Sequence, residues 1–173
     1  TSVFIKLIDR VVEDKRGVIL MVPEISLTPQ MLALFQRRYG RQVAVFHSGL
    51  SMGERLDEWK RVKNGDALIA LGTRSAVFAP FENLGLIIMD EEQEYTYKSE
   101  QAPRFHAREI AKFRCRWHRC LLTLASATPS VESYYLAQKG VYRLSTISSR
   151  YGGAKLPRVV VADMNQELLE GNT

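Results

Sequence analysis

Short runs of consecutive apolar residues, each followed by a turn and then by a helix-like pattern, constrain the fold of this chain more than any other feature. The clearest runs are Val18–Val22 and Leu84–Met89. Each is far shorter than the roughly 20 apolar residues of a membrane-spanning helix. A strand that is buried on both faces produces such a run, and strands of that kind are typical of parallel sheets covered by helices. The runs therefore favour an α/β fold.

Segments with a helical period separate the apolar runs. Thr28-Pro29 resembles a helix cap and first turn, and Ser51 with Glu54 resembles a capping box. Helices are predicted at residues 3–12, from 28 to a stop at 40, from 51 to a turn at 64–66, at 107–117 and at 130–138. Strands are predicted at residues 18–22, 42–46, 67–71, 84–89, 121–124 and 158–162. The alternation predicts a three-layer α/β/α domain with a mostly parallel sheet over residues 1–165, and a linker that begins at 166–173.

Charge and cysteine content narrow the class of protein. The 173 residues carry 24 Lys and Arg against 19 Asp and Glu, and the net charge of +5 modestly favours a polyanionic partner. Two cysteines are too few for a secreted disulfide framework and fit a reducing compartment. The chain begins with Thr1-Ser2 and shows no signal sequence, so we expect it to be a piece of a longer protein.

An acidic run follows the second apolar run directly and consists of Asp90, Glu91 and Glu92, with Gln93 after them. In an open α/β sheet, ligands bind at the carboxyl ends of the strands. An aspartate at that edge can hold Mg²⁺, and the next glutamate can orient or deprotonate a water that attacks a γ-phosphate. A solvated acidic turn would have the same composition, so this feature alone leaves both interpretations open.

Small and hydroxyl-bearing residues follow the other predicted strands. Ser126 and Thr128 lie in one such turn, and Thr73 and Arg74 lie in another. Backbone N–H groups in turns of this kind can bind phosphate, although ordinary helix caps have the same composition. Because each turn follows a strand, we expect all of them at one edge of the sheet, together with the turns at 22–28 and 47–49.

A basic and aromatic segment comes after the acidic run. Arg104, Arg108, Lys112 and Arg116 recur every four residues, which predicts one ridge on a helix. Such a ridge is commonly a solvated helix face. Upstream of it, aromatic residues alternate with cations, and this composition suits stacking on unpaired bases and binding of phosphates. The residues concerned are Tyr95, Tyr97, Lys98, Arg104 and Phe105.

Two other chemistries find little support. Cys115, His118 and Cys120 lack a fourth zinc ligand, and Cys120 opens a predicted strand. The sequence has no G-x-S-x-G motif to accompany its three histidines, so a serine hydrolase site is not indicated.

Five stretches, taken in order, make the chain similar to a known family. They are VPEISLTPQ (22–30), FHSGLSMGERLDEW (46–59), GTRSAVFAPFENLGLIIMDEEQ (72–93), PRFHARE (103–109) and LASATPSVESYY (124–135). They closely resemble the bacterial replication-restart (primosomal) helicases of superfamily 2, over essentially the whole chain. The resemblance implies the first RecA-like motor lobe, which has a P-loop NTPase fold. It also implies a parent that is a 3′→5′ DNA helicase, which couples ATP hydrolysis to movement along single-stranded DNA and restarts replication at stalled forks.

The resemblance also implies roles for individual residues. Asp90 would be a catalytic Mg²⁺ ligand and Glu91 the catalytic base, while Gln93, Ser126 and Thr128 would help to bind the nucleotide. Thr1 would be a second Mg²⁺ ligand, at the end of a phosphate-binding loop that precedes this chain. The implied DNA contacts are Pro23, Glu24, Thr73, Arg74, Tyr95, Tyr97, Lys98, Arg104, Phe105, His106 and Arg108.

For the parent protein, the resemblance implies ATP and Mg²⁺ as cofactors and a bacterial cytoplasmic location at the nucleoid. The implied partners are single-stranded and forked DNA, replication-restart (primosome) proteins and a second helicase lobe, and a membrane is not among them. Zinc is expected only in the region of the second lobe, outside this chain.

Two features depart from the family pattern. The acidic box ends in Gln93 where the family has histidine, and a glutamine donates and accepts hydrogen bonds without carrying charge. The phosphate-binding loop G-x-x-x-x-G-K-[ST] is missing from the chain. We therefore expect the isolated chain to hydrolyse little ATP. A non-catalytic module for DNA binding or protein docking is the alternative.

Overall fold

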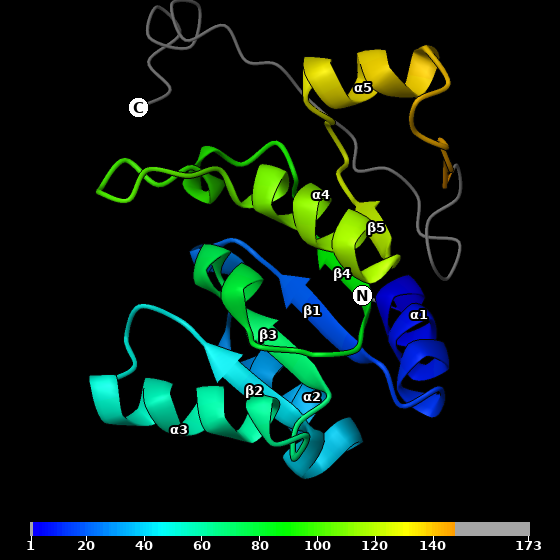
Figure 1. Ribbon diagram of the computed structural model, residues 1–173. Coiled ribbons are helices and arrows are strands. Elements are labelled where there is room, and N and C mark those ends of the chain that lie inside the picture. The colour runs from blue at the N-terminus through cyan, green and yellow to red at the C-terminus, as the bar shows by residue number, and fades with distance from the viewer. Residues whose placement is uncertain (1, 148–173) are drawn as a thin grey trace, which may run out of the picture. The chain divides into compact units, whose positions relative to one another are not determined.

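The computed structural model describes residues 2–147 (Figure 1). The chain divides into two compact units, residues 1–135 and 136–173, and the boundary between them falls inside the last helix of the described part. Thr1, the predicted strand at 158–162 and the predicted linker at 166–173 lie outside the described residues. The domain boundary at residue 165 therefore stays a prediction. Between residues 2 and 147, no helix has both the length and the apolar character needed to cross a bilayer.

Five parallel strands form one sheet in the described part of the chain. They are β1 (Gly17–Met21), β2 (Val43–Phe46), β3 (Ile69–Gly72), β4 (Leu84–Met89) and β5 (Leu121–Leu124). Their order is β2-β3-β1-β4-β5, and each neighbouring pair is parallel. The predicted α/β class and parallel sheet are thus confirmed. Because all five strands run the same way, their carboxyl ends lie at one edge of the sheet.

Helices cover both faces of this sheet. On one face lie α1 (Ser2–Glu13) and α2 (Pro29–Tyr39), whose Ile8 and Phe35 are buried against β1, β3 and β4. On the other face lie α3 (Met52–Lys63) and α4 (Ala107–His118), which contribute Val62 and Ala111 to a second core cluster. After β5 the chain continues into α5 (Val131–Gln138). The three predicted layers are present, and each predicted helix occurs.

The two strands with the continuous apolar runs are the most deeply buried. Every residue of β1 and β4 is buried, since both strands have a neighbour on each side and helices above and below. By contrast, β5 lies at the edge of the sheet and its Leu121 is 56% exposed. Burial on both faces is the physical reason for the apolar runs in the sequence.

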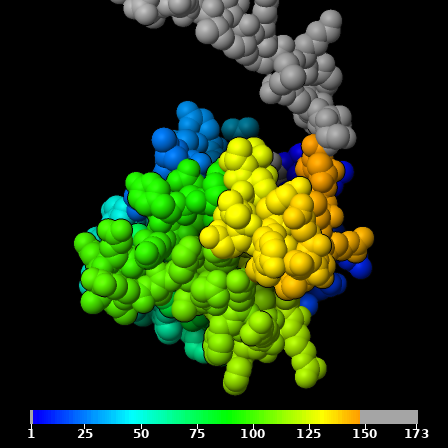
Figure 2. Space-filling model, turned by 90° about the horizontal axis from the view of Figure 1, so that it is seen from above, coloured from blue at the N-terminus to red at the C-terminus, as the bar shows by residue number. Residues whose placement is uncertain are grey.

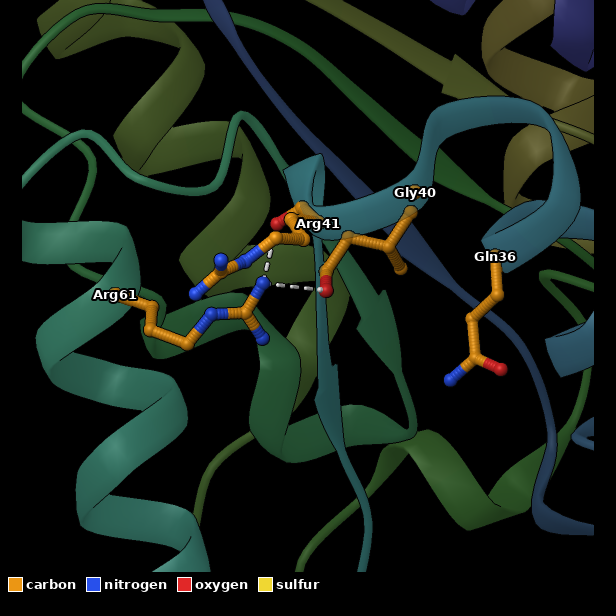
Figure 3. Close-up of a pocket in the computed structure, with 5 residues that line it drawn as sticks. Gln36, Gly40, Arg41 and Arg61 are labelled. Atoms are coloured by element: carbon orange, nitrogen blue, oxygen red, sulfur yellow. Dashed lines mark hydrogen bonds between the residues drawn. The ribbon is translucent and has the colours of Figure 1, made fainter.

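The beginning of β2 is fixed by α3 (Figure 3). The Arg61 guanidinium donates hydrogen bonds to the backbone carbonyls of Arg41 and Val43. Glu58 accepts the backbone N–H of Val45 at 2.9 Å and also pairs with Arg61 at 2.8 Å. A pocket beside these contacts is lined by Gln36, Gly40, Arg41, Val43 and Arg61. It lies at the amino end of β2, away from the edge where the strands end.

The apolar side chains of α4 do not all face the sheet. Ile110 packs against the core, whereas Phe113 is 66% exposed and Trp117 is 77% exposed. The buried residues of the helix are Ala107, Ala111 and Cys115, which are spaced four residues apart. Side chains this small let the helix approach the sheet closely, and the larger rings are left on the outer side.

Candidate active site

The turns after β4 and β5 are joined at the carboxyl edge of the sheet. The backbone N–H of Asp90 donates to the carbonyl of Met21 at 2.9 Å, which extends the pairing of β4 with β1. The N–H of Ala125 donates to the carbonyl of Met89 at 2.9 Å, and the N–H of Glu92 donates back to the carbonyl of Ala125 at 3.0 Å. Two of the predicted constellations, 90–93 and 126–128, are therefore in contact.

Asp90 is a partly buried carboxylate at the end of β4. Its Oδ1 accepts the backbone N–H of Glu91 at 3.1 Å. Burial raises the pKa of the Asp90 carboxyl, and the neighbouring Glu91 carboxylate adds to the rise, while the Glu91 N–H lowers the pKa in part. Within residues 2–147, no Lys or Arg forms an ion pair with Asp90. A desolvated carboxylate beside a second carboxylate favours a bound cation.

The side chains at this edge suit Mg²⁺ better than a metal held by protein ligands alone. In the described part of the chain, no group of three or more His, Cys, Asp and Glu side chains is arranged around a common metal position. Mg²⁺ is usually held by one or two carboxylates, with phosphate oxygens and waters as the other ligands. Asp90 fits such a site. Thr1, the predicted second ligand, lies outside the described residues.

Glu91 is held by a chain of hydrogen bonds that crosses from β4 to β5. Gln93 Nε2 donates to Glu91 Oε2 at 2.9 Å, and the Ser126 hydroxyl donates to Gln93 Oε1 at 2.6 Å. The backbone N–H of Thr128 then donates to Ser126 Oγ at 2.8 Å. A glutamine amide can donate and accept at the same time. Gln93 therefore links Glu91 to Ser126 without carrying a charge.

The backbone of Glu91 is in the left-handed region, with φ of 47°. A residue with a Cβ adopts this conformation at a cost of about 1–2 kcal/mol. The turn gives the three consecutive acids separate surroundings: Asp90 lies at the sheet edge, Glu91 contacts Gln93, and Glu92 is buried. Backbone strain of this kind clusters at functional sites.

These residues could supply part of the chemistry that hydrolyses a phosphoanhydride. A carboxylate whose Oε2 is fixed by Gln93, as in Glu91, can orient a water and accept its proton. Asp90 would hold Mg²⁺, which supplies positive charge to the phosphate oxygens when it is bound. Ser126 and Thr128 complete the path from the base to the turn after β5.

Glu92 has a role that sequence reasoning missed. Its carboxylate is buried and pairs with Arg108 at 3.0 Å. Burial raises the pKa of the Glu92 carboxyl, but hydrogen bonds from Ser130 and Ser133 and the nearby Arg108 cation outweigh this and lower it. Arg108 was predicted to bind DNA, and its side chain is only 16% exposed. That DNA contact stays a prediction. No local spacing rule connects two residues 16 positions apart, so the sequence gives no sign of this pair.

The turn after β3 reaches across to the segment after β4. Thr73 is buried, and Arg74 Nη1 donates to the backbone carbonyls of Thr96 at 3.1 Å and Lys98 at 3.0 Å. Arg74 therefore holds the start of the following loop in place. The turn after β1 places Pro23 in a buried position and Glu24 in an exposed one. The DNA contacts predicted at Pro23, Glu24, Thr73 and Arg74 stay predictions.

Residues 95–106 form a loop between β4 and α4, drawn in bright green in Figures 1 and 2. An antiparallel bridge joins Lys98 to His106, and the N–H of Ser99 donates to the carbonyl of Phe105 at 2.7 Å. His106 caps α4, since its Nδ1 accepts the N–H of Arg108 at 3.2 Å. Burial and the neighbouring cations lower the pKa of His106, which keeps its ring neutral at pH 7. The loop thus has a closed base, with exposed Lys98 and Arg104 side chains.

The aromatic residues of this loop divide into two kinds. Tyr95 is 81% exposed, so its ring is available to a nucleic-acid base. Phe105 is partly buried and packs edge-on against Phe78, with ring centroids 5.0 Å apart. Tyr97 is 1% exposed, and its hydroxyl donates to the carbonyl of Asp90 at 2.6 Å. The prediction that Tyr97 stacks on DNA is therefore corrected: its ring belongs to the core and supports the end of β4.

Comparisons with known proteins identify the family and the kind of domain. The DEAD/DEAH box helicase family matches residues 1–136. The replication restart protein PriA of Bacillus subtilis (strain 168) is 49% identical over 172 residues, which cover 99% of this chain and 21% of that protein. The replication restart protein PriA of Treponema pallidum (strain Nichols) is 44% identical over 169 residues, which cover 98% of this chain and 26% of that protein. The chain thus spans only about a fifth to a quarter of the length of these relatives.

A solved structure supports the fold. The helicase MrfA bound to DNA matches with a TM-score of 0.51 and 12% sequence identity, over 79% of this chain and 19% of that one. At this identity the likeness concerns the arrangement of the sheet and helices alone.

Proposed function

Since this chain belongs to the DEAD/DEAH box helicase family, we propose that it is the first motor lobe of a bacterial replication-restart DNA helicase. The parent hydrolyses ATP with Mg²⁺ when it binds single-stranded DNA, and moves 3′→5′ along that strand. The chain supplies the Mg²⁺ ligand Asp90 and the base Glu91. It relies on residues outside the described part for the phosphate-binding loop and for the facing lobe.

One observation carries this proposal: the continuous chain of hydrogen bonds from Glu91 through Gln93 to Ser126. A solvated acidic turn has no need of such a connection. An enzyme that hydrolyses ATP between two lobes requires a base held in one orientation, linked to a segment that can respond to the nucleotide. The identity of 49% with a replication restart protein supports the more specific assignment.

The DNA-facing surface proposed for the lobe is the edge that carries Tyr95, Lys98 and Arg104. An exposed aromatic ring in the same loop as exposed cations suits a single strand, because bases stack on the ring while the cations contact phosphates. We further propose forked DNA, primosome proteins and the second lobe as partners of the parent, with zinc only in the second-lobe region. The parent would act in the bacterial cytoplasm, at the nucleoid.

The alternative is a degenerate motor lobe that binds DNA or protein without catalysis. The deciding experiment is steady-state ATP hydrolysis by the full-length parent, with and without a single-stranded oligothymidylate. Strong stimulation by DNA would support the motor. No hydrolysis under either condition, with the oligonucleotide still bound, would favour the docking module.

The assignment of the base is tested by Glu91→Gln in the full-length parent. We expect turnover to fall by about 10²–10⁴-fold, because the amide cannot accept the proton, while nucleotide binding is retained. Glu82→Gln is the matched control, since Glu82 precedes β4 at the opposite edge of the sheet and is 76% exposed. Normal turnover in Glu91→Gln would show that another group is the base.

A further inference from the structure

Glu92 lies at the centre of a buried polar cluster that the two catalytic roles do not require. Its side chain is 2% exposed, although it follows Glu91 directly. Glu92 Oε1 accepts the backbone N–H of Ser130 at 2.7 Å. Glu92 Oε2 accepts the hydroxyls of Ser130 at 3.1 Å and Ser133 at 2.9 Å. Both carboxylate oxygens are therefore bound to the beginning of α5.

Arg108 brings a second element to the same carboxylate. Its Nη1 lies 3.0 Å from Glu92 Oε2 and 3.1 Å from the hydroxyls of both Ser130 and Ser133. Arg108 is in the first turn of α4, immediately after the loop of residues 95–106. Its Nε is buried and makes no hydrogen bond in the described part of the chain. In the described part of the chain, the hydrogen bonds of the Arg108 guanidinium are therefore donated by Nη1, and their acceptors are Glu92, Ser130 and Ser133.

The cluster joins three segments that matter for the proposed ATPase. The first is the turn with Asp90 and Glu91, the second is the helix that begins where the loop of 95–106 ends, and the third is the segment after Ser126 and Thr128. Buried, charge-assisted hydrogen bonds have short range and fixed geometry. A displacement of α4 therefore changes the position of Glu92, and through the single peptide bond between them that of Glu91.

We propose that Glu92 is a positioning residue which, with Arg108, transmits contact of DNA with the loop of residues 95–106 to the catalytic base and to the segment 126–130. This inference rests on the proposed function, because it concerns how DNA stimulates hydrolysis. A solvated third acid in the run would make none of these hydrogen bonds to α4 and to the beginning of α5.

The test uses the full-length parent and measures three quantities for each variant. These are ATP hydrolysis without DNA, hydrolysis with saturating oligothymidylate, and oligothymidylate affinity by fluorescence anisotropy. We expect Glu92→Gln to lower the ratio of stimulated to unstimulated hydrolysis by about tenfold, because the amide cannot hold the guanidinium as the carboxylate does. Affinity for the oligonucleotide should stay within about twofold of the wild-type value.

A double-mutant cycle separates transmission from general damage. If Glu92 and Arg108 act through one contact, the pair Glu92→Gln with Arg108→Gln should lower the ratio no further than the more damaging single change. Glu132→Gln is the matched control, because it makes the same change on the exposed side of α5, between Ser130 and Ser133. It should retain the wild-type ratio.

Two results would overturn the inference. One is an equal loss of stimulated and unstimulated hydrolysis in Glu92→Gln, which would make the cluster purely structural. The other is a multiplicative loss in the double variant. If the Glu92→Gln variant shows no cooperative unfolding transition, Ser133→Ala is measured in its place, because it keeps the carboxylate. An unchanged ratio of stimulated to unstimulated hydrolysis in Ser133→Ala would also overturn the inference. A wild-type parent without DNA stimulation would refute the proposed function, and the inference with it.

Discussion

Gly72 ends β3 at the position where any side chain would collide with the neighbouring strand. A Cβ at this residue would lie 2.0 Å from the carbonyl oxygen of Phe46, 2.8 Å from its carbonyl carbon and 2.9 Å from its Cβ. Gly72 and Phe46 are paired in the sheet, and the N–H of Thr73 donates to that same carbonyl at 2.9 Å. The obstacle is therefore backbone that takes part in the sheet, which cannot rotate away.

The cost of Gly72→Ala follows from this geometry. Ordinary van der Waals contact begins at 3.4 Å, so β2 and β3 would have to separate by roughly 1.4 Å at this pair, compared with a usual spacing of about 4.8 Å between strands. Overpacking of this kind costs about 1–3 kcal/mol, and loss of the buried hydrogen bond from Thr73 adds about 1–3 kcal/mol. We therefore expect the free energy of unfolding to fall by about 2–6 kcal/mol.

Gly53→Ala is the matched control for this change. Gly53 lies in α3, and a Cβ there would meet no atom within 4 Å. The added methyl group should raise the free energy of unfolding by about 0.5 kcal/mol, because it restricts the unfolded chain. Urea unfolding followed by far-ultraviolet circular dichroism measures both variants. If the free energy of unfolding of Gly72→Ala lay within about 1 kcal/mol of the wild-type value, the two strands would be able to separate at this pair without the expected cost.

Two further changes test the roles of individual side chains through urea unfolding. Tyr97→Phe removes the hydrogen bond to the Asp90 carbonyl and should lower the free energy of unfolding by about 1–2 kcal/mol. Tyr95→Phe, at an exposed ring, should change it by less than about 0.5 kcal/mol, and equal effects would contradict the division between these two residues. The hydrogen bond from Arg38 holds the pKa of Asp9 below its usual 3.8, so the stabilisation is present at neutral pH and is lost as the pH falls through the folded-state value. Asp9→Asn should therefore destabilise the chain by about 0.5–1 kcal/mol at pH 7, and this difference should disappear as the pH falls through the folded-state pKa of Asp9, whereas a pH-independent difference would show that the charge is not the cause.

Local chemistry explains why much of the fold could be predicted from the sequence. The N–H of Met31 donates to the Thr28 hydroxyl, and the Ser51–Glu54 capping box has both of its hydrogen bonds. These contacts span three residues, so they are visible in the sequence. The apolar runs of β1 and β4 likewise indicate from the sequence alone that both strands are buried. The order of the strands along the sheet depends on how the connections between strands cross over the sheet. No short-range sequence pattern predicts that order.

The features that sequence reasoning missed are decided by contacts between distant segments. In the sequence, Tyr97 resembles an exposed aromatic residue beside a cation, Lys98, and only its contact with the end of β4 makes it a core residue. The Glu92–Arg108 pair depends on the relative placement of β4 and α4. On α4, small residues face the sheet because the helix lies close to it. In the candidate site, the sequence predicts that Asp90, Glu91 and Glu92 lie together after a strand. It does not predict that each carboxylate has different contacts.

The left-handed backbone of Glu91 has a consequence for how this position varies. Glycine would adopt the same conformation with no steric penalty, so a library sorted only for folded protein would enrich Glu91→Gly. A library sorted for ATP turnover in the parent would remove the same variant, because it lacks the carboxylate. Stability and activity therefore make opposite demands on a single residue. Sequencing both libraries would show glycine enriched at position 91 in the library sorted for folding and depleted there in the library sorted for turnover.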